Sequence, residues 1–178
     1  MIAAVYGKTD KRPVIYTLMK LFQKLGDTCL VSNDRHYTRL LEDGETIGHY
    51  QNIFVAVSDA MPDEIFEEIG YTVDDFENFI FDDTIPDNAD IVIFVEGCVI
   101  TELEQETLDY LDNYVSIGIG FGKNMVPYTV DMFKNMELIE GKKFLTEVDK
   151  KLTKKLASAL SKPLNMPATT ICKVVSKR

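Results

Sequence analysis

The sequence predicts an α/β fold: a doubly wound, mainly parallel β-sheet with helices on both faces, in a single domain over residues 1–178. Three observations support this prediction. Apolar runs of strand length alternate along the chain with amphipathic stretches of helical period. The first strand–helix–strand unit occupies about 34 residues, a length typical of a parallel βαβ crossover. No internal repeat or low-complexity linker divides the 178 residues.

The first βαβ unit has the clearest pattern. Residues 1–6 form a short apolar run, as expected of a buried strand. Pro13 suits the first turn of the following helix, in which apolar residues recur at helical spacing until Gly26 ends it. A second buried strand is predicted over residues 28–32, and the helix between the two strands implies that they run parallel.

The rest of the chain continues this alternation. Further strands are predicted over residues 52–57, 77–81, 90–95, 115–121 and 169–175. Helices are predicted over residues 62–70, 126–136 and 142–161. A further helix is expected after a capping box, in which Thr101 caps the N-terminus and Glu104 reciprocates.

Charge is distributed unevenly along the chain. There are 19 Lys and Arg residues and 29 Asp and Glu residues, for a formal net charge of −10. Residues 40–122 contain 21 acidic residues and no Lys or Arg, whereas both flanking segments are net basic. This distribution favours a protein partner, or self-association, through acidic and basic surfaces, and the net charge disfavours nucleic acid.

Composition also excludes several classes of protein and site. No apolar run approaches the roughly 18 residues that span a bilayer, and the N-terminus lacks a signal-peptide pattern. The cysteines, Cys29, Cys98 and Cys172, lie about seventy residues apart, so zinc-binding spacing is absent. With only two histidines, a His-rich metal centre is not expected either. Sparse cysteines fit a reducing compartment, and we therefore expect a cytoplasmic protein.

The turn after the first strand is the candidate ligand site, because helix N-termini and free backbone amides meet there in sheets of this class. This turn contains the cations Lys8, Lys11 and Arg12, which favour an anion. However, Gly7 is its single glycine and no GxxxxGK[ST] motif is present, so a backbone cradle for phosphate is not predicted.

Two stretches resemble the MinD/ParA family. VYGKTDKRPVIYTLMKLFQKLGDTCLVSND resembles its N-terminal strand, deviant Walker A loop (GKGGxGK[ST]), helix and second strand. Without gaps, the family's Gly and signature Lys fall on Gly7 and Lys8, and its acidic switch I position falls on Asp34. FENFIFDDTIPDNADIVIFVEG resembles the switch II region, with Asp82 or Asp83 at its Asp position.

The same alignment departs from the family at two positions. The Walker lysine falls on Pro13, which has neither an ammonium nor an N–H group, and the Mg²⁺-binding Ser/Thr falls on Val14, which offers no oxygen. The resemblance therefore implies a pseudo-ATPase that needs no cofactor and leaves any bound nucleotide intact. The candidate ligand-binding residues are Gly7, Lys8, Lys11, Arg12, Asp34, Asp82 and Asp83.

Acidic residues gather in two further places, which we interpret as solvated surface. The carboxylates of residues 82–90 lack EF-hand spacing, so a solvated turn with capping aspartates is favoured over a weak Mg²⁺ site at the end of the strand, and no metal ligand is assigned. The second group fits the solvent face of an amphipathic helix, and no catalytic residue is assigned to it. Its members are Glu102, Glu104, Glu106, Asp109 and Asp112.

The basic helix over residues 142–161 allows three interpretations. It can cover the sheet with a solvated basic face, dock on an acidic protein surface such as that of a second copy, or lie on an anionic membrane surface. The first is favoured. The membrane is disfavoured because the chain continues beyond the helix into another apolar run.

Together these patterns favour a non-hydrolysing assembly, positioning or scaffold factor that acts through protein–protein contacts, and they disfavour an enzyme. Two alternatives stay open. One is a small nucleotide-binding enzyme that holds phosphate through Lys8, Lys11 and Arg12. The other is a structural subunit of a larger assembly.

Overall fold

One sheet organises the residues that this computed structural model describes, namely 1–58, 64, 66–67, 70–120, 122–141 and 149–176. Its strand order is β3-β4-β2-β5-β1-β6-β7, and all neighbouring strands are parallel except β3 and β4. The predicted doubly wound, mainly parallel sheet is therefore confirmed. The strands are β1 (Ile2–Tyr6), β2 (Thr28–Ser32), β3 (Ile47–Tyr50), β4 (Ile53–Val57), β5 (Asn78–Asp82), β6 (Ile91–Glu96) and β7 (Val115–Gly118).

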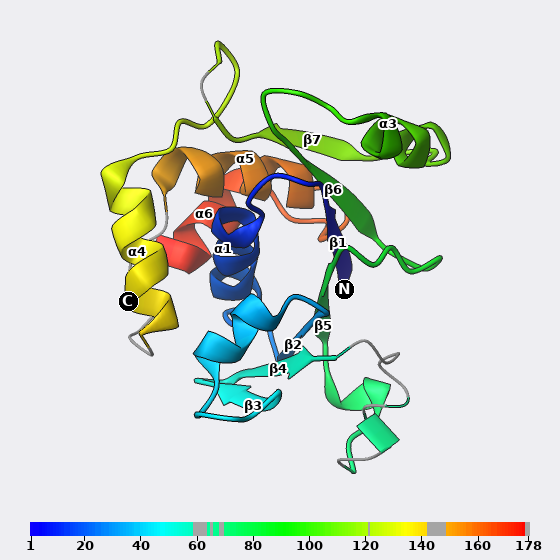
Figure 1. Cartoon of the computed structure of the whole chain (residues 1–178), viewed down its shortest axis with the longest axis vertical. Coiled ribbons are helices and arrows are strands. Elements are labelled where there is room, and N and C mark those ends of the chain that lie inside the picture. Colours follow the sequence, from blue (N-terminus) through cyan, green and yellow to red (C-terminus); the bar gives the residue numbers. More distant parts are fainter. Residues whose placement is uncertain (59–63, 65, 68–69, 121, 142–148, 177–178) are drawn as a thin grey trace.

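Helices cover both faces of this sheet (Figure 1). On one face, α1 packs against α4, α5 and α6. On the other face, Leu108 of α3 packs against Tyr6 and Phe94. The helices are α1 (Arg12–Phe22), α3 (Glu102–Asp109), α4 (Val130–Glu140), α5 (Lys150–Leu160) and α6 (Ala168–Ser176), with 3-10 helices η1 (Arg35–Leu40) and η2 (Val73–Asp75). Among the described residues, no helix is long and apolar enough to cross a membrane.

Helix α1 forms the centre of the larger core. Its residues from Pro13 to Phe22 are all buried, because the sheet lies on one side and three helices lie on the others. A helix that is apolar on most of its circumference is stable only in such surroundings. This burial fixes the start of α1 beside the ends of β1 and β5.

The predicted strand over residues 169–175 is wrong, because this segment forms helix α6. The backbone N–H groups of Thr170 and Ile171 donate to the carbonyl of Pro167 at 2.8 and 3.1 Å, which starts the helix. Ile171 and Cys172 then face the core at adjacent helical positions. Packing against α5 therefore outweighs the strand propensity of this β-branched segment.

Other boundaries differ from the predictions by less. Helix α4 begins four residues later than expected, at Val130, because Thr129 caps it by accepting a hydrogen bond from Met132 N at 3.1 Å. The edge strand β3 and η1 were not predicted from the sequence. Most of the helix expected over 62–70, and the first part of the one expected over 142–161, lie outside the described residues; α5 covers 150–160.

Candidate functional site

Residues 7–11, here called the first loop, connect β1 to α1 at the carboxyl ends of the adjacent strands β1 and β5. Ligands bind at this edge in open parallel sheets, because helix N-termini converge there. Gly7 has a φ of 140°, and a Cβ atom at this position would lie 2.5 Å from the carbonyl oxygen of Val95. Only glycine fits there, so the loop passes directly against β6.

The ammonium group of Lys11 lies within the first loop. Its Nζ donates to the carbonyl of Gly7 at 3.0 Å and to Oδ2 of Asp83 at 2.7 Å, and it lies 3.3 Å from Oδ1 of Asp82. Burial opposes protonation of Lys11, but the two carboxylates outweigh this and raise the pKa of its ammonium. Lys11 is therefore a charged group held by partners from the same chain.

Asp82 is the most enclosed carboxylate of this group, with a side chain that is 1% exposed. Its Oδ2 accepts a hydrogen bond from the hydroxyl of Ser32 at 2.8 Å, which connects the ends of β5 and β2. Burial raises the pKa of Asp82, and the charge of Lys11 opposes this only in part. Lys11 is thus the counter-ion that offsets part of the free-energy cost of burying this carboxylate.

Glu104 of α3 also reaches the first loop. Its Oε1 accepts a hydrogen bond from the backbone N–H of Lys8 at 2.7 Å, while its Oε2 accepts from the N–H and hydroxyl of Thr101 at 2.8 and 2.7 Å. Burial disfavours the charged form, but these hydrogen bonds outweigh it and lower the pKa of Glu104. A carboxylate of the same chain therefore accepts the hydrogen bond of a backbone N–H group in the loop.

This contact corrects one interpretation of the sequence. Glu104 is 2% exposed and does not belong to the solvated face, whereas Glu102, Glu106 and Asp109 are exposed as expected. Asp112 is also exposed but lies beyond the end of α3. The predicted capping box is present, but nothing local in the sequence indicates that Glu104 also binds Lys8.

Asp10 accepts a hydrogen bond from the first backbone N–H group of α1. Its Oδ1 accepts from the backbone N–H of Arg12 at 3.1 Å and from Nε at 2.9 Å, and its Oδ2 accepts from Nη2 at 2.7 Å. Burial opposes ionisation of Asp10, but the contacts with Arg12 are stronger and lower its pKa. The guanidinium of Arg12 is therefore already paired on the side of the first loop.

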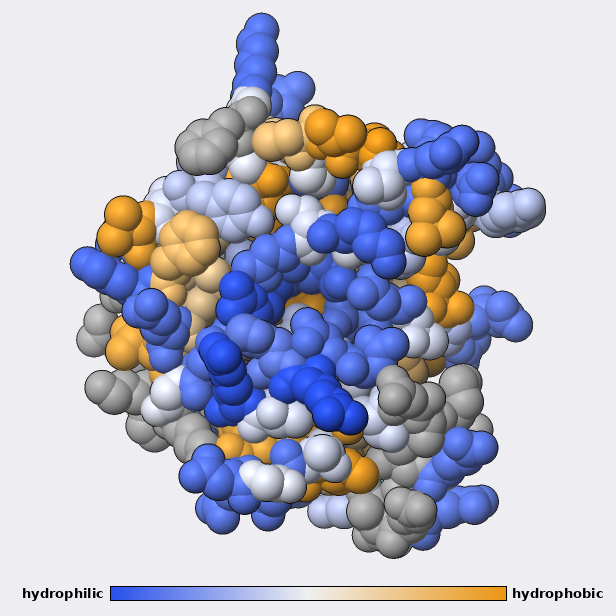
Figure 2. All heavy atoms as spheres, viewed as in Figure 1, coloured by the Kyte–Doolittle hydropathy of each residue, from blue (hydrophilic) through white to orange (hydrophobic). Residues whose placement is uncertain are grey.

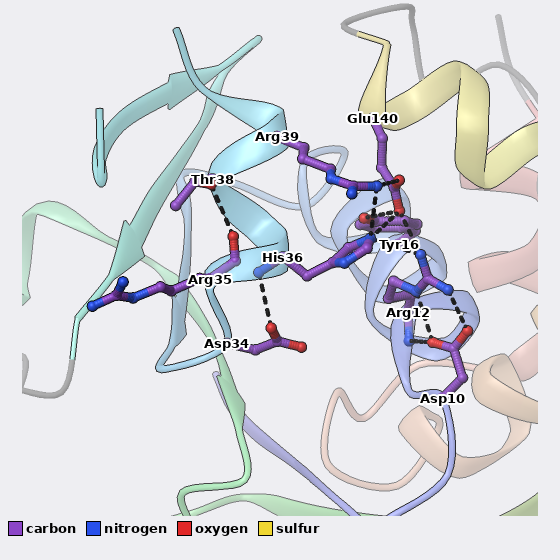
Figure 3. Close-up of polar contacts among 9 residues, drawn as sticks. All are labelled: Asp10, Arg12, Tyr16, Asp34, Arg35, His36, Thr38, Arg39 and Glu140. Carbon is purple, nitrogen blue, oxygen red and sulfur yellow. Dashed lines mark hydrogen bonds and ion pairs between the residues drawn. The ribbon is translucent and has the colours of Figure 1, made fainter. Parts of the chain in front are cut away.

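On its other side, Arg12 joins a group that we call the Glu140 cluster, made of Arg12, Tyr16, His36, Arg39 and Glu140 (Figure 3). Oε1 of Glu140 accepts from Nη1 of Arg12 at 2.9 Å and from the hydroxyl of Tyr16 at 3.1 Å, and it lies 3.1 Å from Nε2 of His36. Its Oε2 lies 3.4 Å from Nη1 of Arg39. The cluster connects α4 to α1 and η1.

The side chain of Glu140 is only 10% exposed. Burial opposes its ionisation, but His36 and Arg12 outweigh this and lower its pKa. Sequence reasoning missed Glu140, because 128 residues separate it from Arg12 and no motif marks it.

The structure brings most of the candidate residues together. Gly7, Lys8, Lys11 and Arg12 lie in or next to the first loop, and Asp82 and Asp83 contact it through Lys11. Asp34 lies farther out, where its side chain caps η1 by accepting from His36 N at 2.8 Å. An open hollow of about 280 Å³ separates it from the loop, lined by Lys8, Thr9, Asp10, Lys11, Arg12, Asp34, His36 and Tyr37. Figure 2 shows strongly hydrophilic side chains gathered over the middle of this face.

The acidic turn after β5 has structural partners. The carboxylate of Asp90 accepts a hydrogen bond from the backbone N–H of Ile2 at 2.7 Å, at the start of β1. Among the described residues, no group of three or more His, Cys, Asp or Glu side chains is arranged to hold a metal ion.

No family model and no curated protein matches the chain. Among solved structures, it is similar to a candidate plasmid partition protein from Borrelia burgdorferi B31 bound to AMPPNP, with a TM-score of 0.50 and 13% identity over 96% of this chain and 97% of that one. The MinD cell division protein of Aquifex aeolicus gives a TM-score of 0.45 and 12% identity over 98% and 94% of the two chains. The likeness to the partition protein shows the MinD/ParA-like fold that the sequence resemblance implied.

Proposed function

We propose that the chain is a non-hydrolysing assembly or positioning factor, which uses a MinD/ParA-like fold as a scaffold for protein–protein contacts. One observation carries this proposal: carboxylates of the same chain already bind donors of the first loop and of the start of α1. Glu104 binds the N–H of Lys8, Asp10 binds the N–H of Arg12, and Asp82 and Asp83 hold the ammonium of Lys11.

This occupancy disfavours a nucleotide phosphate. To use the same donors, a phosphate would have to displace Glu104 and Asp10 or lie against their negative charges. Two like charges about 4 Å apart repel each other by a few kcal/mol in the partly screened surroundings of a protein surface. Apart from the exposed ammonium of Lys8, the loop therefore lacks the uncompensated positive character that phosphate loops provide.

The positions of Pro13 and Val14 also support the proposal. Val14 is 0% exposed within the main core, and Pro13 faces a small space between α1, α4 and α5 beside Tyr16 and Met132. Neither residue lines the hollow at the first loop. The two positions that the resemblance assigns to phosphate and magnesium binding thus contribute to packing.

The fold agrees with the proposed role. The structure at TM-score 0.50 is described as a plasmid partition protein, and partition is a positioning task. The present chain would act in a comparable way through its surfaces, without nucleotide turnover.

The test is isothermal titration with ATP and Mg²⁺, combined with a phosphate-release assay. We expect no binding heat at millimolar ATP and no phosphate release above that of the buffer. Tight binding with turnover would contradict the proposal.

A second candidate function is a small nucleotide-binding enzyme, favoured by the position of Lys8, Lys11 and Arg12 around one open hollow. Lys8 is the informative residue, because its side chain is exposed and its reversal breaks none of the ion pairs described above. If the enzyme is correct, Lys8→Glu will weaken ATP binding at least tenfold. A scaffold factor will show no ATP binding in either form.

A further inference from the structure

We infer that the exposed side of α3 is a docking surface for a cationic, amphipathic segment of a protein partner. This inference rests on the proposed function, because it names the kind of partner that an assembly or positioning factor would hold. The supporting observations are a group of exposed apolar side chains, a row of carboxylates beside them, and the contacts of the inner side of α3 with the sheet.

The apolar side chains are concentrated within twelve residues of sequence. Val99, Ile100, Leu103 and Tyr110 are 79, 40, 56 and 89% exposed. Leu103 belongs to α3 and Tyr110 is its C-cap residue; the seven positions between them, with Tyr110 in helical conformation, place both on the same side. Val99 and Ile100 directly precede the N-cap residue, Thr101. Single exposed apolar residues are ordinary, but such a group marks an interaction surface.

Three carboxylates flank this apolar group. Glu102, Glu106 and Asp109 are exposed and follow the next side of the helix around its axis. Within the described part of the chain, none of them forms an ion pair, and residues 40–122 contain no Lys or Arg. Their charge is therefore left for a partner to neutralise.

Helix α3 contacts the sheet and the first loop on its inner side. Leu108 packs against Tyr6 and Phe94, and the hydroxyls of Thr107 and Tyr6 lie 2.9 Å apart. Figure 1 shows α3 at the margin of the molecule, and Figure 2 shows hydrophobic atoms next to strongly hydrophilic ones in that corner. A surface on such a preformed helix loses little conformational entropy when a partner binds.

An apolar stripe beside carboxylates matches a segment in which apolar residues alternate with Lys or Arg at helical spacing. Anionic membranes and nucleic acids would be repelled. The basic helix α5 of a second copy fits less well, since its apolar residues Leu152, Leu156 and Leu160 are buried in its own core. In addition, the ammonium groups of Lys151 and Lys155 already donate to the carbonyls of Met125 and Asn124.

The experiment is a fluorescence-anisotropy titration of the full chain with a labelled amphipathic peptide, LKKLLKLLKKLLKL, at low salt. The variant Glu102→Gln/Glu106→Gln/Asp109→Asn removes three charges, and we expect it to weaken binding about tenfold. The variant Leu103→Ser/Tyr110→Ser should weaken binding to a similar extent while keeping every charge. Circular dichroism should show the same helix content in both variants as in the wild type.

A matched control separates this surface from net charge. Glu42→Gln/Asp43→Asn/Glu45→Gln removes three exposed charges from the segment before β3, and we expect it to change the affinity less than twofold. Equal weakening by the control, or equal binding of the acidic peptide LEELLELLEELLEL, would overturn the inference. So would sedimentation data in which the wild type self-associates and the α3 variants do not, because the occupant would then be a second copy.

These outcomes are independent of the nucleotide experiments. The peptide titration contains no nucleotide, so a chain that hydrolyses ATP could still bind the peptide. Conversely, if the chain bound neither ATP nor the peptide, the proposed function would still stand and only the docking surface on α3 would be rejected.

Discussion

The carboxylate of Glu104 and the backbone N–H of Lys8 form a 2.7 Å hydrogen bond between residues 96 positions apart. This bond joins α3, on one face of the sheet, to the first loop at its edge. The carboxylate of Glu104 therefore binds the loop where the phosphate of a ligand would otherwise bind. The helix that presents the proposed docking surface is thus also the helix that occupies the loop.

Removal of Glu104 should destabilise the fold. Glu104→Ala leaves the partly buried N–H groups of Lys8 and Thr101 without their acceptor, and we expect a loss of about 2 kcal/mol in the free energy of unfolding. Urea denaturation measures this loss. Glu106→Ala, at an exposed position of the same helix, should cost less than about 0.5 kcal/mol. Equal effects of the two substitutions would show that the contact with Lys8 contributes nothing.

The Glu140 cluster should stabilise the attachment of α4. Glu140→Gln keeps the size of the side chain but removes the carboxylate that Nη1 of Arg12 and Nε2 of His36 contact, so we expect a loss of about 2 kcal/mol. Glu137→Gln removes a charge from an exposed position of the same helix and should change the free energy of unfolding by less than about 0.5 kcal/mol. Urea denaturation of both variants checks this difference, and a Glu140→Gln protein as stable as the wild type would refute it.

Low pH should reduce the free energy of unfolding through the carboxyl groups of Asp10, Glu104 and Glu140. The pKa of each is lowered in the folded state, so each contributes stability above its unfolded value of about 4, which is lost as the pH falls through the folded pKa. Asp82 acts in the opposite direction, because its folded pKa is raised and its protonation relieves a buried charge. The stability that Asp10, Glu104 and Glu140 contribute is lost as the pH falls below about 4, so we expect the free energy of unfolding to be lower at pH 3 than at pH 5.

Glu140→Gln is the variant that tests this assignment. It lacks one of the three lowered carboxyls, so it should lose less stability than the wild type between pH 5 and pH 3. Urea denaturation at both pH values gives the comparison. An identical loss in the two proteins would mean that Glu140 contributes nothing to the acid sensitivity.

The parts of this architecture that were predictable from sequence depend on local patterns. The unit β1–α1–β2 was predicted because apolar residues 1–6 and 28–32 flank a helix that begins near Pro13. Helix α6 was missed because its β-branched segment becomes helical only through packing against α5. The contact of Glu104 with Lys8 and the contacts of Glu140 with Arg12 and His36 were not predictable, since folding creates them between distant segments and leaves no periodic signal for them.

Titration with pyrophosphate shows whether the chain's own carboxylates block the first loop and the start of α1. The variant Asp10→Asn/Glu104→Gln keeps the shape of both side chains but removes the two negative charges that bind the N–H groups of Arg12 and Lys8. We predict that isothermal titration at millimolar pyrophosphate detects no binding to the wild type and measurable binding to the variant. Tight binding by the wild type, with the same affinity in the variant, would contradict the account.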